Sequence, residues 1–216
     1  IYEPENGDEP VPPDPPDGPG GGEGEDEGDE GGKKILVSGV QAKIIAERIE
    51  YLGPDGNLIT ESYKDFSRKQ IKSEFESLDE FIRRWNSAKK KQAIIDELEE
   101  YGIVLGNLAE IVGKEYGDFD LICHIAFDQP PLTRKERANN VKKRNYFTKY
   151  GEQARSVLNA LLDKYADKGI STIETAKVLK LKPFSDMGTP VEIINDIFGG
   201  KDSYETALEE LEQQLY

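Results

Sequence analysis

Several residue types are scarce in this chain of 216 residues. Its one cysteine, Cys123, excludes an internal disulfide framework and fits a reducing compartment. No apolar run approaches the roughly 18 to 20 residues needed to cross a bilayer, and no charged segment followed by an apolar one opens the chain. We therefore expect a cytoplasmic protein with no membrane partner.

Lysine and arginine are absent from residues 1–32, where Asp, Glu, Pro and Gly fill 28 of 32 positions. Such a composition cannot build an apolar core, so we predict a disordered acidic Pro/Gly-rich linker over residues 1–32. The formal net charge is -15 for the whole chain but -3 for residues 33–216. The low isoelectric point is therefore a poor guide to partners. Because the chain starts at Ile1 and its only methionine is Met187, we expect it to be part of a longer protein.

Residues 33–63 carry the only convincing β signal, and we predict a small β-hairpin connector module there. The run "KKILVSG" is typical of a short strand, and "LGPDGNLITES" places a Pro-Asp-Gly turn before another one. The run "IIAERIEY" between them fits either a strand or a helix.

Residues 64–216 predict a helical C-terminal domain, so the fold class is mainly α. Ser77 and Glu80 form a capping box, followed by apolar residues at helical spacing. Further apolar stripes occur at 94–101, 108–112, 119–127, 154–165 and 204–215. We predict a loop over 178–188, a helix from Thr189 to Phe198, and a last helix capped by Asp202 and Glu205.

The segment "FDQPPLTRKERANNVKKRNYF" contrasts with the rest of the chain in charge. Residues 133–150 contain one acidic residue, Glu136, and seven basic ones: Arg134, Lys135, Arg137, Lys142, Lys143, Arg144 and Lys149. Thr133 and Glu136 form a second capping box, which predicts a basic helix whose charges face solvent or a partner. These basic side chains can form a solvated face of the helix, or a surface that binds phosphate or an acidic protein. We favour the binding surface.

The sequence contains only weak matches to motifs for nucleotide binding, metal binding or catalysis. "FGGKDS" fails as a nucleotide-binding loop because Asp202 follows Lys201. Cys123 and His124 are sequence neighbours near Asp120, but neighbours on a helix point in different directions. We predict no catalytic residue, no metal site, no cofactor and no small-molecule substrate for this chain.

Several separated runs resemble one family: "DFDLICHIAFDQPPLTRKERANNVKKRNYFTKYGEQARSVLNALLDKYADKGI", "VLKLKPFSDMGTPVEIINDIFGG" and "ALEELEQQLY". Together they are similar to the C-terminal domain of the R subunit of type I restriction-modification enzymes. "IEYLGPDGNLITESYKDFSR" resembles the segment that joins the motor domains to this domain. The resemblance covers nearly all of residues 33–216, with the motifs in order.

The resemblance implies a helical domain that helps to attach the R subunit to the methyltransferase and specificity subunits. The same subunit would hold, upstream, an ATP-dependent translocase and endonuclease with its ATP and Mg. "QPPLTRKER" and "KYGEQAR" match family motifs and carry no catalytic role to transfer. Their candidate structural residues are Gln129, Pro130, Pro131, Thr133, Glu136, Tyr150 and Gly151.

Three alternatives stay open. A free-standing helical adaptor could use the basic helix on double-stranded DNA or on RNA. An enzyme could use His124, and a structural cap could pack only on its own motor domains. The sequence does not decide whether the basic helix contacts protein or DNA.

Overall fold

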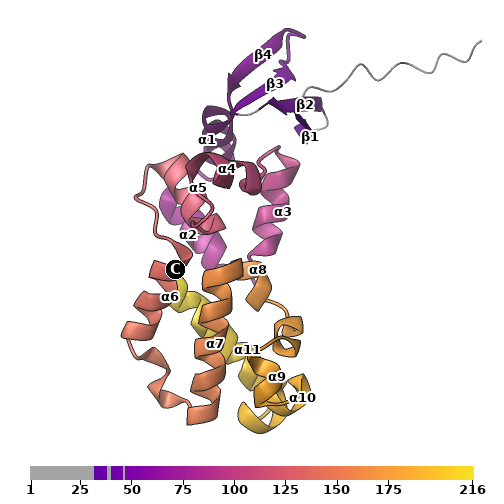
Figure 1. The fold of residues 1–216 in the computed structure, drawn as a ribbon. Helices are drawn as coiled ribbons and strands as arrows, with labels where there is room; N and C mark the ends of the chain where they lie inside the picture. The colour runs from indigo at the N-terminus through magenta and orange to yellow at the C-terminus, as the bar shows by residue number, and fades with distance from the viewer. Residues whose placement is uncertain (1–31, 38–39, 46) are drawn as a thin grey trace, which may run out of the picture. The chain divides into compact units, whose positions relative to one another are not determined.

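The structure is a computed structural model that describes residues 32–37, 40–45 and 47–216. These residues belong to one compact unit, Gly31–Tyr216. The acidic linker predicted for residues 1–32 lies, except for Gly32, outside the described residues. The domain is mainly α with a small sheet, as predicted (Figure 1).

The sheet has four antiparallel strands in the order β1-β2-β3-β4. Their bounds are β1 Lys33–Val37, β2 Val40–Ile45, β3 Arg48–Leu52 and β4 Leu58–Ser62. The run "IIAERIEY", left open between strand and helix, contributes to β2 and β3. The predicted turn before β4 is confirmed, since Gly56 has a φ of 77° and donates its N–H to the Gly53 carbonyl at 2.9 Å.

One face of the sheet packs on the helices that follow it. Tyr51 of β3 lies against Phe66, with ring centroids 5.5 Å apart. The Tyr63 hydroxyl, fully buried, donates to the Gly102 carbonyl at 2.9 Å. Gly102 has a φ of 81°, and a Cβ there would lie 2.5 Å from Cγ2 of Val37. The segment that follows helix α3 (Gln92–Glu100) therefore approaches strand β1 too closely for any residue except glycine at position 102.

Helices make up the rest of the domain (Figure 1). The α-helices are α1 Tyr63–Glu74, α2 Leu78–Ser87, α3 Gln92–Glu100, α4 Leu105–Val112, α5 Asp118–Phe127, α6 Arg134–Lys143, α7 Glu152–Lys168, α8 Ile170–Ile173, α9 Phe184–Met187, α10 Pro190–Glu192 and α11 Lys201–Leu215. Two 3-10 helices, η1 Tyr146–Lys149 and η2 Ala176–Lys180, and a π-helix, η3 Ile193–Ile197, complete them. None of the helices in the described part of the chain has both the length and the apolar character to span a bilayer.

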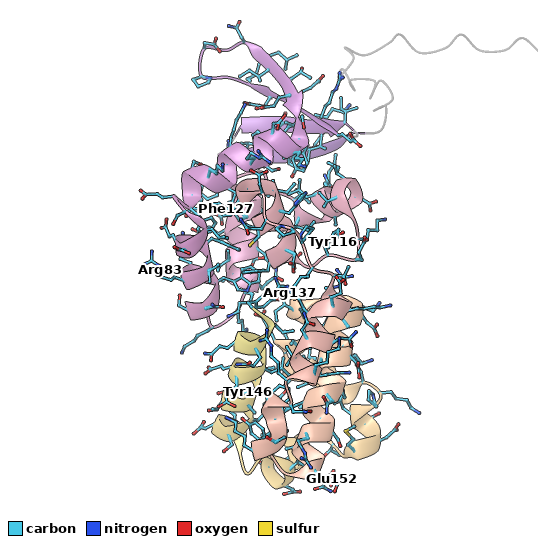
Figure 2. All side chains as sticks on the ribbon, turned by 90° about the vertical axis from the view of Figure 1, so that its left-hand side faces the viewer. Arg83, Tyr116, Phe127, Arg137, Tyr146 and Glu152 are labelled. Carbon is cyan, nitrogen blue, oxygen red and sulfur yellow. The ribbon has the colours of Figure 1, made fainter. Side chains whose placement is uncertain are left out.

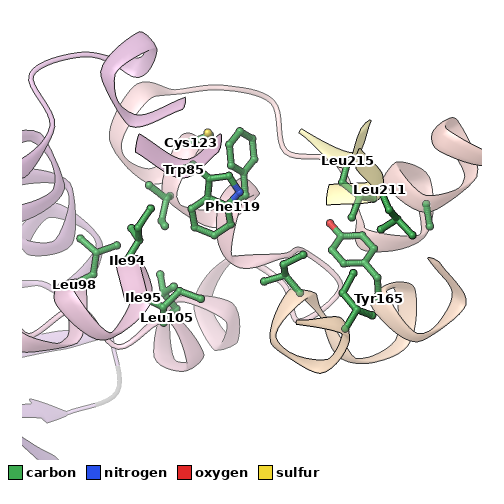
Figure 3. Packing of buried hydrophobic residues seen from close by; sticks show 14 of the residues in the cluster. Trp85, Ile94, Ile95, Leu98, Leu105, Phe119, Cys123, Tyr165, Leu211 and Leu215 are labelled. Carbon is green, nitrogen blue, oxygen red and sulfur yellow. The ribbon is translucent and has the colours of Figure 1, made fainter. Parts of the chain in front are cut away.

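An aromatic cluster forms the core of the first helices (Figure 3). Phe81 and Trp85 of α2 are fully buried, as the apolar stripe after Ser77 predicted, and the Ser77 side chain caps α2. Phe119 of α5 lies 5.4 Å from Phe81 and 5.5 Å from Trp85 between ring centroids. This cluster continues into the core of α7 and α11, where Tyr165 and Leu211 are buried.

Three local predictions differ from the structure. Residues 178–188, expected as a loop, contain the end of η2 and all of α9. The last helix starts at Lys201 with Gly200 as its N-cap, so Asp202 lies inside its first turn instead of capping it. The basic helix ends at Lys143, and Asn145, with a φ of 51°, separates it from η1.

Candidate binding surface on the basic helix

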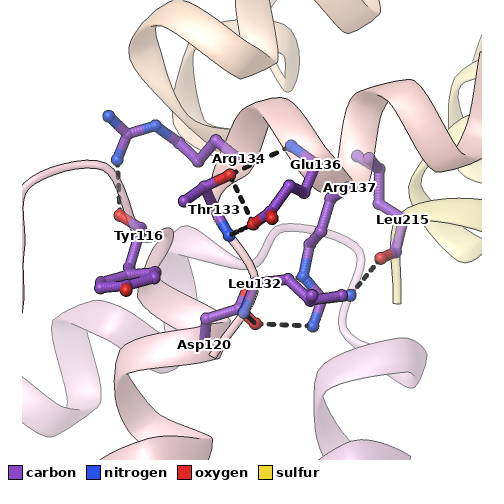
Figure 4. Close-up of polar contacts among 8 residues, drawn as sticks. All are labelled: Tyr116, Asp120, Leu132, Thr133, Arg134, Glu136, Arg137 and Leu215. Atoms are coloured by element: carbon purple, nitrogen blue, oxygen red, sulfur yellow. Dashed lines mark hydrogen bonds and ion pairs between the residues drawn. The ribbon is translucent and has the colours of Figure 1, made fainter. Parts of the chain in front are cut away.

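Helix α6 begins at a tightly defined cap. The Glu136 N–H donates to the Thr133 hydroxyl at 3.2 Å, and the Thr133 N–H donates to the Glu136 carboxylate at 2.8 Å (Figure 4). The Thr133 hydroxyl also donates to this carboxylate, at 2.8 Å, and the hydrogen bonds that the carboxylate accepts from the Thr133 N–H and hydroxyl lower the pKa of Glu136. The predicted capping box is confirmed, and it fixes where the basic helix starts.

The family-motif residues before α6 turn the chain from α5. Asp128 ends α5 with a φ of 53°, and the Gln129 N–H donates to the Cys123 carbonyl at 3.2 Å. Pro130 and Pro131 follow in the connection to Thr133, which has no regular secondary structure. Gly151 is the N-cap of α7, and the Tyr150 hydroxyl bonds to Glu210 at 2.5 Å. The contacts of these residues lie within the domain.

Two of the seven basic candidates have their guanidinium groups bound inside the protein. Arg134 donates to the Tyr116 carbonyl at 2.5 Å (Figure 4). It also donates to the Lys114 carbonyl at 2.8 Å. Arg137 pairs with Asp120. Figure 2 shows Arg137 near the middle of the domain. The expectation that the charges of this helix face solvent or a partner therefore does not hold for Arg134 and Arg137.

Arg137 has the densest set of contacts. Its Nε and one terminal nitrogen donate to the Asp120 carboxylate at 2.5 and 2.9 Å, and its other nitrogen donates to the Leu215 carbonyl at 2.5 Å. The guanidinium also lies over the rings of Phe119, at 4.8 Å, and Tyr216, at 5.3 Å. Sequence reasoning missed this role because nothing along the chain shows that Asp120 and Leu215 meet Arg137.

Two lysines of the segment form ion pairs at the surface. Lys142 contacts Asp163 of α7 at 2.5 Å, and Lys149 contacts Glu210 of α11 at 2.7 Å. The hydrogen bond to Glu210 raises the pKa of Lys149. Both pairs join the basic segment to neighbouring helices, so their charges are partly neutralised.

The remaining three candidates, Lys135, Lys143 and Arg144, are exposed and form no ion pair within the described residues. Lys135 and Lys143 are eight residues apart, which places them on one side of α6 about two turns apart. Asn139 lies between them on the same side and is also exposed. On the opposite side of α6, Ala138 and Val141 are buried. Lys135, Asn139 and Lys143 therefore form a basic and amide-bearing side of α6, and Arg144 adds a further cation at its C-cap. These four residues define the basic face, which the exposed carboxylate of Glu136 adjoins.

Cys123, His124 and Asp120 have separate partners. Burial raises the pKa of the Cys123 thiol to about 12. Nδ1 of His124 lies 3.1 Å from the Gln129 carbonyl, and the Asp120 carboxylate is bound to Arg137. Trp85, Phe81 and Tyr165 lie in the core, as predicted.

The comparison with known proteins decides the family. A family model described as EcoEI R protein C-terminal matches residues 61–216. The chain belongs to this family. The resemblance to the C-terminal domain of the R subunit of type I restriction-modification enzymes is thereby confirmed.

One relative is the "Type I restriction enzyme EcoAI endonuclease subunit" of Escherichia coli. It is 55% identical over 184 residues, which cover 85% of this chain and 23% of the relative. The chain thus spans about a quarter of the length of that protein. No solved structure matches the chain.

Proposed function

We propose that this chain is an assembly domain, which helps to attach the R subunit of a type I restriction enzyme to its methyltransferase and specificity subunits. Membership of the EcoEI R protein C-terminal family carries this proposal. The printed name of the relative, an endonuclease subunit, agrees with it because a subunit acts within a larger assembly. ATP-dependent translocation and DNA cleavage, with ATP and Mg, would belong to other parts of the same subunit.

The basic face of α6 is the surface that we assign to this attachment. Lys135 and Lys143 project from a helix that Arg134 and Arg137 hold to the body of the domain. A fixed helix loses little conformational freedom when its charges meet a partner. Charges at a rim set the approach and register of a partner more than its final affinity, so the contact should depend on salt.

Native mass spectrometry of this chain with its cognate methyltransferase and specificity subunits tests the proposal. A complex that forms without DNA is the expected result. Binding only when a DNA duplex is added would instead support the nucleic-acid adaptor, whose affinity falls steeply with salt. If no complex forms in either mixture, the proposed assembly function is wrong. The remaining interpretation is then a structural cap that packs only on its own motor domains.

A further inference from the structure

A buried polar cluster joins three segments that lie far apart along the chain. Lys91, which precedes α3, is 3% exposed, and Glu212 of α11 is 5% exposed. Nζ of Lys91 lies 3.5 Å from the Glu212 carboxylate and donates to the Ala88 carbonyl at 2.9 Å. Glu174, the C-cap of α8, accepts a hydrogen bond from the Lys91 N–H. Lys91, Glu174 and Glu212 are named the carboxylate cluster.

Glu174 lies where a negative charge is stabilised. Lys91 is the N-cap of α3, but its own side chain does not cap that helix. The Glu174 carboxylate, 83 positions later in the chain, takes this role by accepting the Lys91 N–H. The first N–H groups of a helix lack acceptors within the helix and carry partial positive charge, so they favour an ionised carboxylate. Burial raises the pKa of Glu174, and the N–H groups of Lys91 and Gln92 oppose that rise.

Glu212 is the carboxylate that holds a proton in this cluster. Two ionised carboxylates beside one ammonium would leave an uncompensated negative charge in a site removed from water. Such a charge is strongly unfavourable, and one bound proton removes it. Because Glu174 has the N-terminus of α3 to stabilise its charge, the proton belongs on Glu212. Burial raises the pKa of Glu212 to about 7 against the attraction of Lys91, and the charges of Glu174 and Glu209 add to this rise.

Three further titratable groups among the described residues face the cluster, and none of them supplies a buried positive charge. Lys90 near Glu174 and Glu209 near Glu212 are exposed, so solvent screens their charges. The buried hydroxyl of Tyr204 has no hydrogen-bond partner in the described part of the chain. Burial and the charge of Glu212 raise the pKa of Tyr204 to about 12, so it stays neutral near pH 7. The ionisation of Glu212 therefore changes the charge of the cluster near neutrality.

The end of α11 has a second attachment that keeps its charge. Arg137 donates to the Leu215 carbonyl, three residues after Glu212, and a guanidinium does not lose its proton in proteins. The connection 88–91 instead reaches α11 through the Lys91 ammonium. Loss of the Glu212 proton should therefore release this connection while α11 stays in place.

We propose that the carboxylate cluster is a proton-controlled latch between the connection 88–91 and the helices α8 and α11. While Glu212 holds its proton, the segment that contains Lys91 stays bound to both helices. When the proton leaves, the uncompensated negative charge draws in water, and the connection opens locally together with the start of α3. The rest of the domain stays folded. The latch does not depend on the proposed assembly function.

The sign of the pH dependence follows from the shift of Glu212. Its pKa is about 7 in the closed latch and returns to its ordinary value of 4.5 once water reaches the opened latch. The proton therefore stabilises the closed latch fully below pH 4.5, and this contribution is lost as the pH rises through about 7. Between pH 6 and pH 8, the equilibrium constant for opening should rise about tenfold.

Hydrogen–deuterium exchange of the whole chain at pH 6 and pH 8 tests the latch, with labelling times scaled to equal intrinsic exchange. Peptides that cover 88–94 and 170–176 should lose protection about tenfold at pH 8. They should also exchange faster than peptides from α7, and low urea should leave their rates unchanged because local opening exposes little surface. If they exchange at the α7 rate with the same urea dependence, the opening is global unfolding and the latch is wrong.

Two variants of α11 assign the proton. E212Q keeps a neutral side chain at every pH, so the pH dependence of these peptides should disappear. Glu205 provides a matched control, since its carboxylate is 53% exposed and lies 3.5 Å from the Lys201 ammonium. E205Q should retain the change of about tenfold. A change of the same size in E212Q, or no change in the wild type, would overturn the latch.

Discussion

The carboxylate of Asp120 accepts two hydrogen bonds from the guanidinium of Arg137, at 2.5 and 2.9 Å. The two side chains are only 3% and 13% exposed, respectively, so the pair is largely removed from water. Arg137 also donates to the Leu215 carbonyl. One arginine of the most basic segment thus joins α5, α6 and α11.

Replacing Arg137 should cost much of the stability of the domain. R137A leaves the Asp120 carboxylate buried without its cation, and the free energy of unfolding should fall by about 3–5 kcal/mol. K135A, on the exposed side of the same helix, should change it by less than about 0.5 kcal/mol. Urea unfolding at pH 7 measures both. Equal, small losses would show that the pair does not hold α6 in place.

The basic face should control assembly in a salt-dependent way. K135A, K143A and R144A combined should weaken binding to the methyltransferase and specificity subunits at low salt, and the difference should shrink as salt is added. Loss of cations near the end of α6 should cost the fold only about 0.3–1 kcal/mol.

Lys177, Lys180 and Lys182 provide a matched control for that triple variant. They are three exposed lysines in and after η2, and their replacement by Ala changes the net charge equally. Isothermal titration calorimetry should show near wild-type affinity for this control. If both triple variants weaken binding equally, the effect is one of net charge and the α6 surface is not the contact.

Glycine should be required at the end of α3 but not in α4. G102A places a Cβ 2.5 Å from Cγ2 of Val37 at a φ of 81°, so the free energy of unfolding should fall by about 1–3 kcal/mol. Gly106 lies in α4, and a Cβ there would meet nothing within 4 Å. G106A should therefore stabilise the domain by up to about 1 kcal/mol through helix propensity. Thermal unfolding of both variants checks this, and similar effects would contradict the close approach of β1 and α3.

Stability should fall as the pH rises toward neutrality because of Glu212. Burial, opposed by Lys91 and reinforced by Glu174 and Glu209, raises the pKa of Glu212 to about 7. Its side chain is 7% exposed and lies 3.5 Å from the Lys91 ammonium. The folded state then holds a proton that the unfolded state releases above its ordinary pKa of 4.5. This contribution is complete below pH 4.5 and is lost as the pH rises through about 7.

E212Q removes the titrating group and isolates this effect. Between pH 5.5 and 8, the wild type should lose about 1–3 kcal/mol relative to E212Q, as expected from a shift of this size. Glu174, whose pKa burial also raises, contributes in the same direction in both proteins and so largely cancels. Urea unfolding at several pH values gives the comparison. Parallel stability profiles would show that Glu212 does not titrate in this range.

Much of the fold follows from local pattern. The caps at Ser77 and Thr133 and the stripe that contains Phe81 and Trp85 were predictable because each depends on residues within two turns. The short helices η2 and α9 were not, since four or five residues carry too little periodicity. Gly200, which lacks a side chain, gave no capping signal for α11.

The site was less predictable than the fold. Helical spacing alone could have separated the exposed Lys135 and Lys143 from the opposite side of α6. It could not have shown that Arg134 binds the Tyr116 carbonyl or that Arg137 meets Asp120, because these contacts join residues 17 or more positions apart.

Competition for assembly tests the central claim most directly. The cognate R subunit, methyltransferase and specificity subunits are mixed with increasing amounts of this chain, and ATP-dependent cleavage of DNA is measured. If the chain is the assembly domain, it occupies the attachment site of the intact R subunit, so cleavage should fall to background at saturation. Added methyltransferase and specificity subunits should then restore cleavage. Full cleavage at a large excess of folded chain would contradict the account.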